Sequence, residues 1–155
     1  MLELIITCAI PYPFLTPDSL YDYKNCLEME YKVGAVEQHI ELIVEEFGID
    51  EALIPLLIIY CESSGKENAI NYNTNGTTDR GLFQFNDKTW AWLKPKLNII
   101  STPYNKKVAT KVAKWLMKND GLHHWNASRK CWDYDNKNLK RNGKIIKRNR
   151  TYKRW

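Results

Sequence analysis

One carboxylate, Glu62, lies two positions beyond an unusually apolar stretch of the chain, residues 53–60. Apart from Pro55, that stretch is apolar on every face of a helix, so such a helix must be surrounded by protein. A carboxyl group at its end loses solvent, and burial raises the pKa because the charged form is disfavoured. A carboxyl group that stays protonated near neutral pH can protonate the leaving oxygen when a glycosidic bond breaks. The alternative is that Glu62 lies beyond the helix end, in solvent.

A second carboxylate, Asp79, follows 17 residues later, beyond the turn pair Asn75-Gly76. Asn-Gly is the strongest short signal for a β-hairpin, and a hairpin would let Asp79 face Glu62 across a groove. A separation of about 5 Å between the two carboxyl groups suits a retaining glycosidase, and about 6.5–9.5 Å suits inversion through a water molecule. The alternative is that Asp79 is an ordinary turn residue.

The sequence disfavours two other chemistries, a metal site and a nucleophilic cysteine. His123 and His124 are adjacent, but no third ligand accompanies them at a suitable spacing, so we expect surface or packing histidines and no metal site. The four cysteines are widely scattered, without the paired spacing of zinc sites, and we expect reduced thiols. Cys61 lacks a recognisable histidine partner, which argues against a nucleophilic cysteine. No metal or organic cofactor is predicted.

The chain is rich in aromatic side chains, with six tryptophans and nine tyrosines. Sugar rings present apolar faces that stack on such side chains, and Tyr72 and Trp125 are the candidates for this role near the groove. For Trp90, Trp92 and Trp115 we favour packing in the core.

Hydrophobic periodicity predicts the elements that hold these residues. The first predicted helix begins at Val36 and is amphipathic, with Gly48 able to end it. The second is the apolar helix over residues 53–60, for which Asp50 is the expected N-cap.

Two further helices follow the predicted hairpin. Residues 87–93 form a short helix that should stop before Pro95, and a longer amphipathic helix covers residues 104–118 with lysines on its outer face. Helices with one small antiparallel hairpin make an α+β fold.

The chain has the length of one domain, with 155 residues of which 44% are hydrophobic. We expect an irregular N-terminal segment over residues 1–33, a catalytic domain over 34–134 and a basic tail over 135–155. No stretch approaches the roughly 18 apolar residues of a membrane span, and we expect neither a signal peptide nor a membrane anchor.

Charge is distributed unevenly along the chain. Residues 1–60 carry eleven acidic side chains against two lysines, whereas residues 135–155 carry nine basic side chains against one acid. The basic segment would favour a polyanion, either a cell-wall polymer or an acidic protein, and nucleic acid is the less favoured partner. The alternative is a solvated, partly disordered tail.

Residues 62–86 resemble, without a gap, the catalytic segment of the lysozyme superfamily, which includes animal-type lysozymes and the lytic transglycosylases of the SLT type from bacteria and phages. The family pattern is Glu-Ser, an Ala-x-Asn loop and Thr-Asp-x-Gly-Leu-x-Gln-x-Asn. In this chain the pattern is filled by Glu62, Ser63, Asn71, Asp79, Gly81, Gln84 and Asn86.

The resemblance covers about residues 50–132 and implies a lysozyme-like fold with the hairpin at the catalytic cleft. It implies Glu62 as the acid/base, Asp79 as the second carboxylate, and Ser63, Asn71, Gln84 and Asn86 as substrate-binding residues. The implied substrate is peptidoglycan, cut at the β-1,4 bond between N-acetylmuramic acid and N-acetylglucosamine. Hydrolysis and transglycosylation, in which the sugar's own hydroxyl attacks and leaves an anhydro end, both remain open.

The disulfide framework of the animal enzymes is absent from the sequence, so bacterial and phage forms are the expected relatives. We expect a phage protein that acts on the host wall, located in the virion or the bacterial cell envelope, whose ends could dock on other virion proteins. The alternative is a domain of the same fold that binds glycan or a structural partner and does not cut.

Overall fold

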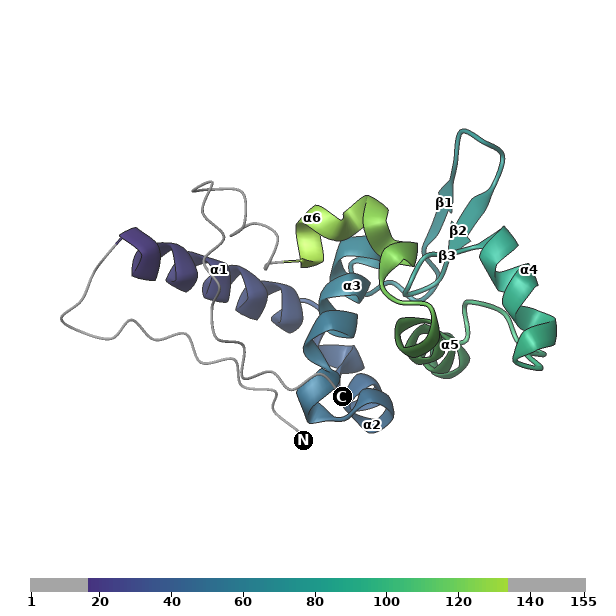
Figure 1. Cartoon of the computed structure of the whole chain (residues 1–155), viewed down its shortest axis with the longest axis horizontal. Coiled ribbons are helices and arrows are strands. Elements are labelled where there is room, and N and C mark those ends of the chain that lie inside the picture. The colour runs from purple at the N-terminus through teal and green to yellow at the C-terminus, as the bar shows by residue number, and fades with distance from the viewer. Residues whose placement is uncertain (1–16, 134–155) are drawn as a thin grey trace.

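The computed structural model describes residues 17–133, with side chains from residue 23 onward, and it has the α+β architecture expected from the sequence (Figure 1). None of the helices within these residues is long and apolar enough to cross a membrane. In chain order the elements are α1 (Pro17–Gly34), η1 (Glu37–His39), α2 (Ile40–Phe47), η2 (Ile49–Glu51), α3 (Leu53–Ser63), β1 (Ile70–Tyr72), β2 (Thr78–Arg80), β3 (Phe85–Asn86), α4 (Asp87–Lys96), α5 (Lys106–Asn119), η3 (His123–Ser128) and α6 (Arg129–Trp132).

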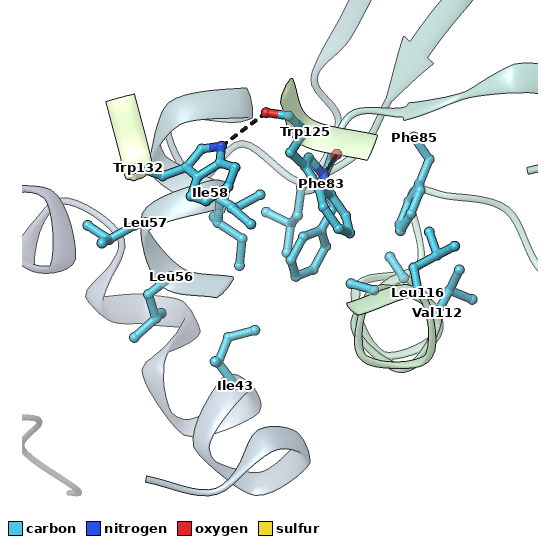
Figure 2. Packing of buried hydrophobic residues seen from close by; sticks show 14 of the residues in the cluster. Ile43, Leu56, Leu57, Ile58, Phe83, Phe85, Val112, Leu116, Trp125 and Trp132 are labelled. Carbon is cyan, nitrogen blue, oxygen red and sulfur yellow. Dashed lines mark hydrogen bonds between the residues drawn. The ribbon is translucent and has the colours of Figure 1, made fainter. Parts of the chain in front are cut away.

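Helix α3 forms the centre of the fold, with α1, α2, η3 and α6 in contact with it. Its residues 56–59 are fully buried, which confirms the prediction of an apolar helix enclosed by protein (Figure 2). Pro55 lies in the first turn, where its missing N–H leaves no helical hydrogen bond unmade. The prediction of Asp50 as the N-cap of α3 is wrong. Asp50 lies in η2, and Ala52 is the residue that precedes the helix.

A cluster of aromatic side chains from β3, α4, η3 and the segment just before β3 forms another part of the core. The Phe83 ring lies 6.3 Å from the Trp125 ring, and the Phe85 ring lies 5.2 Å from that of Trp90. Trp90 is therefore in the core, as predicted, whereas Trp92 is 46% exposed and the prediction of core packing is wrong for it.

The three strands form one antiparallel sheet in the order β1-β2-β3. The predicted hairpin at Asn75-Gly76 is confirmed: the Asn75 side chain accepts hydrogen bonds from the backbone N–H and the hydroxyl of Thr77. Asn71 pairs with Asp79, and Asp79 pairs with Asn86, so these three residues form one row across the sheet. Directly paired residues project from the same face of a sheet, and this row therefore defines one face.

Residues 17–33 are not irregular, because α1 occupies Pro17–Gly34 and packs against α3. Pro17 begins the helix rather than breaking the chain, which is the position where proline is tolerated best. Val33 is 3% exposed and belongs to the core, so the predicted domain boundary at residue 34 is also wrong. Residues 1–16 and the predicted basic tail lie outside the described residues.

Polar residues on the inner face of α1 explain why periodicity missed it. Lys32 is buried, donates to the Cys131 carbonyl oxygen at 2.7 Å and pairs with Glu28 at 2.7 Å. Cys26, which also lies in α1, is disulfide-bonded. A helix that packs through such groups shows no apolar stripe.

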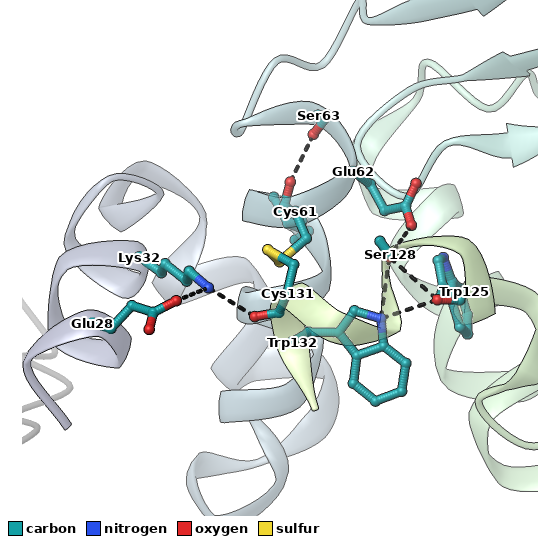
Figure 3. The surroundings of a disulfide bond; sticks show 10 residues. Glu28, Lys32, Cys61, Glu62, Ser63, Trp125, Ser128, Cys131 and Trp132 are labelled. Carbon is teal, nitrogen blue, oxygen red and sulfur yellow. Dashed lines mark hydrogen bonds and ion pairs between the residues drawn. A yellow bond between two sulfur atoms is a disulfide. The ribbon is translucent and has the colours of Figure 1, made fainter. Parts of the chain in front are cut away.

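The prediction of reduced thiols is wrong. Cys61 of α3 and Cys131 of α6 form a disulfide with Cα atoms 6.0 Å apart, and none of the cysteines that the structure describes is free (Figure 3). The bridge spans 70 residues of sequence, and closing a loop of that length stabilises the fold by about 4 kcal/mol in the chain-entropy model. It connects the residue before Glu62 to the C-terminal helix.

Helix α4 extends beyond its predicted end, whereas α5 corresponds to the predicted amphipathic helix. α4 does not stop before Pro95 but continues to Lys96, so Pro95 lies in the last turn. Its missing N–H removes one helical hydrogen bond, and the helix ends one residue later. α5 matches the predicted amphipathic helix and buries Val112 and Leu116.

Two glycines of the sheet region provide a matched test of close packing. Gly81 (φ 78°) follows β2, and a Cβ atom there would lie 2.2 Å from the Pro103 carbonyl oxygen; Gly76 (φ 79°) has open space around it. Ala at either site incurs about 1–2 kcal/mol of left-handed strain, and Gly81→Ala adds an overpacking cost of about 1–3 kcal/mol. Urea unfolding should therefore show a larger loss of stability for Gly81→Ala than for Gly76→Ala. Equal losses would mean that the Gly81–Pro103 approach does not constrain the fold.

Candidate active site

Glu62 lies in the last turn of α3 and is half-buried. The helix ends one residue later, at Ser63, because Ser64 and Gly65 both take left-handed backbone conformations. Burial raises the pKa of Glu62 above its ordinary value, and the negative charge of Asp79 raises it further. A hydrogen bond from Ser128 acts in the opposite direction and lowers this pKa, but burial is the larger effect.

The Ser128 hydroxyl donates a hydrogen bond to Glu62 Oε1 and connects the carboxyl group to a second pair of residues (Figure 3). Trp132 Nε1 donates to Ser128 Oγ at 3.1 Å and to the Trp125 carbonyl oxygen at 3.1 Å. Ser128 Oγ also lies 3.2 Å from that same carbonyl oxygen. The hydroxyl therefore has one fixed donor and two possible acceptors.

This geometry suits both protonation states of Glu62. With Glu62 ionised, the Ser128 hydroxyl gives its proton to Oε1. With Glu62 protonated, the carboxyl O–H can donate to Ser128 Oγ, while the Ser128 proton turns to the Trp125 carbonyl oxygen. The indole N–H of Trp132 stays on Ser128 Oγ in either state. A group that must give up a proton and later accept one can thus keep its hydrogen bond throughout.

Asp79 is held in a fixed orientation by two amide side chains. Asn73 Nδ2 donates to Asp79 Oδ2 at 2.9 Å, and Asn86 Nδ2 donates to Asp79 Oδ1 at 2.8 Å. Both amide N–H groups point at the carboxylate oxygens and so fix the positions of these oxygens. The structure thus supplies one carboxyl group with a raised pKa and one firmly anchored carboxylate that acts on it electrostatically.

Asn86 and Gln84, predicted to line a sugar groove, both make hydrogen bonds within the protein. Asn86 also donates to the Thr77 hydroxyl at 2.9 Å and caps α4 by accepting from the Lys88 N–H at 3.2 Å. Gln84 has φ 48°, and its side-chain amide donates to the backbone carbonyl oxygens of Gly81 at 2.8 Å and Ala69 at 3.2 Å. Their observed role is to fix the sheet and Asp79.

Asn71 and Tyr72 are both exposed on β1 but project from opposite faces. Asn71 lies in the row that contains Asp79 and donates to the Asn73 side chain at 3.2 Å. Tyr72 is 77% exposed, and strand alternation turns it away from the Asp79 face. Asn71 is therefore placed beside Asp79, and Tyr72 is not.

Two of the predicted substrate-binding side chains are buried. Ser63 is 7% exposed and its hydroxyl donates to the Ile59 carbonyl oxygen at 3.0 Å. Trp125 is 3% exposed, packs on Phe83 and Phe85, and donates through Nε1 to the Phe83 carbonyl oxygen at 2.9 Å (Figure 2). These positions argue against the predicted glycan contacts of both side chains: Ser63 completes the helix, and Trp125 is part of the core.

Asn73, Ser128 and Trp132 are site residues that sequence reasoning missed. Asn73 stands two residues before the Asn75-Gly76 turn, which gave a local signal, because a polar residue there can reach across the hairpin. Ser128 and Trp132 lie 66 and more residues after Glu62, and no spacing rule connects residues that far apart. Only the folded chain brings α6 beside the end of α3.

A family model described as the transglycosylase SLT domain matches residues 40–129, which is more than half of the chain. The matched range begins with α2 and includes Glu62, the hairpin with Asp79, and Ser128. Searches of curated proteins and of solved structures returned no significant match.

Ser128→Ala should shift the pH profile of activity toward higher pH. The Ser128 hydrogen bond lowers the pKa of Glu62, so removing it raises that pKa, and the acid form needed for catalysis persists to higher pH. The measurement is kcat/KM against pH, with attention to the alkaline limb. Ser101→Ala, which removes a hydroxyl outside this network, serves as the control. An unmoved alkaline limb in Ser128→Ala would contradict the role given to this hydrogen bond.

Glu62→Gln should make the folded chain more stable near neutral pH. A group whose pKa is raised by folding contributes stability below its unfolded pKa and loses that contribution as pH rises through the folded pKa. The ionised Glu62 is therefore unfavourable at neutral pH, and Gln removes its charge while still accepting from Ser128. Thermal unfolding should show a higher Tm near neutral pH, by roughly 2–4 °C for each kcal/mol gained, and a vanishing difference near about pH 4. The exposed Glu45→Gln is the control, and a lower Tm for Glu62→Gln at neutral pH would refute the argument.

Proposed function

The chain belongs to the transglycosylase SLT domain family, whose members are lytic transglycosylases that act on peptidoglycan, and from that premise we propose that it cleaves the β-1,4 bond between N-acetylmuramic acid and N-acetylglucosamine. The observation that carries the proposal is the pairing of a half-buried Glu62, whose pKa is raised, with an Asp79 fixed by two amide donors.

In the first step the protonated Glu62 transfers its proton to the glycosidic oxygen, and the bond from that oxygen to the muramic acid C1 breaks. The departing N-acetylglucosamine leaves as a neutral alcohol, and positive charge develops at C1 and the ring oxygen. In the second step the ionised Glu62 accepts the proton of the 6-hydroxyl, whose oxygen bonds to C1. The products are an anhydro-muramic end and an intact Glu62, with no water consumed.

Asp79 supports this sequence as a fixed negative charge. Its two oxygens accept from Asn73 and Asn86, so the carboxylate does not need to reorganise as positive charge develops on the sugar. It also raises the pKa of Glu62, which helps to keep the acid protonated before reaction. Because both oxygens already accept hydrogen bonds, we assign Asp79 an electrostatic role and give the proton transfers to Glu62.

Ser128 allows the same residue to serve in both steps. Before the first step, Ser128 Oγ can accept a hydrogen bond from the protonated Glu62. After that step, the Ser128 hydroxyl can turn from the Trp125 carbonyl oxygen and donate to the Glu62 carboxylate. The exchange requires only rotation about the Ser128 C–O bond. We therefore class Ser128 as a positioning residue.

We further propose that the chain acts outside the bacterial cytoplasm, as a phage protein in the virion or the cell envelope. Disulfides form and persist in oxidising compartments, and the Cys61–Cys131 bridge supports this location. The substrate itself lies in the envelope.

Glu62→Gln should abolish release of muropeptides from purified peptidoglycan sacculi, because Gln has no proton to transfer. A loss of at least about 10²–10⁴-fold is expected for removal of a general acid. Turnover is measured as soluble muropeptide over time, with Glu45→Gln as the control for loss of one exposed carboxylate. Unchanged turnover in Glu62→Gln would reject the enzyme assignment for this site and favour a glycan-binding domain.

Mass spectrometry of the wild-type products distinguishes the two possible reactions. Transglycosylation leaves 1,6-anhydro-muramic ends, which are lighter by one water than the reducing ends left by hydrolysis. We expect anhydro ends. Reducing ends alone would instead assign a hydrolytic water and make the chain a lysozyme-like hydrolase.

A further inference from the structure

Three side chains at the junction of α5 and η3 converge on one point, away from the residues assigned to the reaction. His124 Nε2 lies 2.7 Å and His123 Nε2 lies 3.6 Å from the same oxygen, Asp120 Oδ2. The ligand-type atoms of all three residues lie within 4.8 Å of one another. Sequence reasoning found no third ligand for the histidines, and the fold supplies one in Asp120.

The backbone builds this convergence. Asp120 is the C-cap of α5, and Gly121 follows with φ 85°, a left-handed conformation that reverses the chain. The N–H groups of Asp120 and Gly121 both donate to the Leu116 carbonyl oxygen at 2.8 Å. This turn brings His123 and His124, the first residues of η3, back beside the Asp120 carboxylate.

The electrostatics of the junction favour a cation. A carboxylate at the C-terminus of a helix lies at the negative end of the helix dipole, where positive charge is stabilising and negative charge is not. Asp120 nevertheless occupies that position, directly after the last turn of the 14-residue helix α5. The two imidazole rings, with centroids 4.2 Å apart, direct their Nε2 atoms to the same place.

We propose that Asp120, His123 and His124 form a binding site for a transition-metal ion of the zinc class. Imidazole nitrogen combined with one carboxylate suits zinc, nickel and copper, whereas calcium and magnesium prefer oxygen ligands. Zinc bonds of about 2.0–2.1 Å place neighbouring tetrahedral ligands about 3.3–3.4 Å apart. The distances of 2.7 Å and 3.6 Å lie on either side of that value, so small side-chain rotations suffice.

The ion would be structural. The site is open to solvent on the Asp120 and His123 side, so water completes the coordination. Binding would join the end of α5 to η3, whose last residue is Ser128, the donor to Glu62. His124 also packs edge-on against Trp125 with ring centroids 6.0 Å apart, which fixes one ligand to the core. The ion would hold this segment in place and take no part in the reaction.

The test is calorimetric titration of the untagged full-length chain with zinc chloride, in buffer without a reducing agent so that the disulfides stay intact. We expect one zinc ion per chain. Loss of a residue that only hydrogen-bonds to a metal ligand already weakens metal sites by about 10–100-fold. Loss of a direct ligand in Asp120→Asn, His123→Ala or His124→Ala should therefore weaken zinc binding by at least about 10-fold. Asp50→Asn, which removes an exposed carboxylate elsewhere, should bind as the wild type does.

A second measurement uses the unaltered chain and so does not depend on the folding of variants. Diethylpyrocarbonate modifies accessible histidines, and mass spectrometry locates the modified residues. Zinc should protect both His123 and His124. Absence of zinc binding, equal binding by all three ligand variants, or modification of both histidines at saturating zinc would each overturn the proposal. None of these readouts depends on cleavage of peptidoglycan, so the outcome is separate from that of the proposed function.

Discussion

The chemistry of this protein depends on the partial burial of one carboxyl group at the end of an apolar helix. Helix α3 is enclosed along residues 56–59 and ends one residue after Glu62, so the carboxyl group is at the border between core and solvent. Deeper in the helix it could not reach a substrate, and further out it would ionise as an ordinary glutamate does. The fold therefore serves mainly to fix where α3 ends and what lies beside that end.

Three separate restraints hold α6, the helix that follows the Ser128 donor to Glu62. The disulfide joins Cys131 to Cys61, Lys32 of α1 donates to the Cys131 carbonyl oxygen, and Trp132 donates to the carbonyl oxygen of Trp125 (Figure 3). Each restraint begins in a different element, so α6 cannot shift without breaking one of them. This is the physical reason why α1, outside the residues matched by the family, still bears on the site.

The sequence predicted what local patterns encode and missed what distant packing creates. The apolar helix, the Asn75-Gly76 hairpin and the pairing of Glu62 with Asp79 follow from periodicity, turn chemistry and family resemblance over a short range. Helix α1 was missed because its inner face carries polar groups such as Lys32. The sequence predicted that Trp125 stacks on sugar rings in the groove. A tryptophan can equally well pack in the core, and the residue type does not distinguish these two roles, whereas burial does.

The two carboxyl groups of the site have different environments, and this difference divides their work. Among the residues that the structure describes, Glu62 has one hydrogen-bond donor, Ser128, whose effect is smaller than that of burial, so the pKa of Glu62 stays raised. Asp79 has two amide donors, one for each oxygen, and both come from the sheet itself. A proton carrier needs a hydrogen-bond partner that can reverse its direction, which a hydroxyl can do and an amide N–H cannot. The serine beside one carboxyl group and the asparagines beside the other therefore account for a mobile proton at Glu62 and a fixed charge at Asp79.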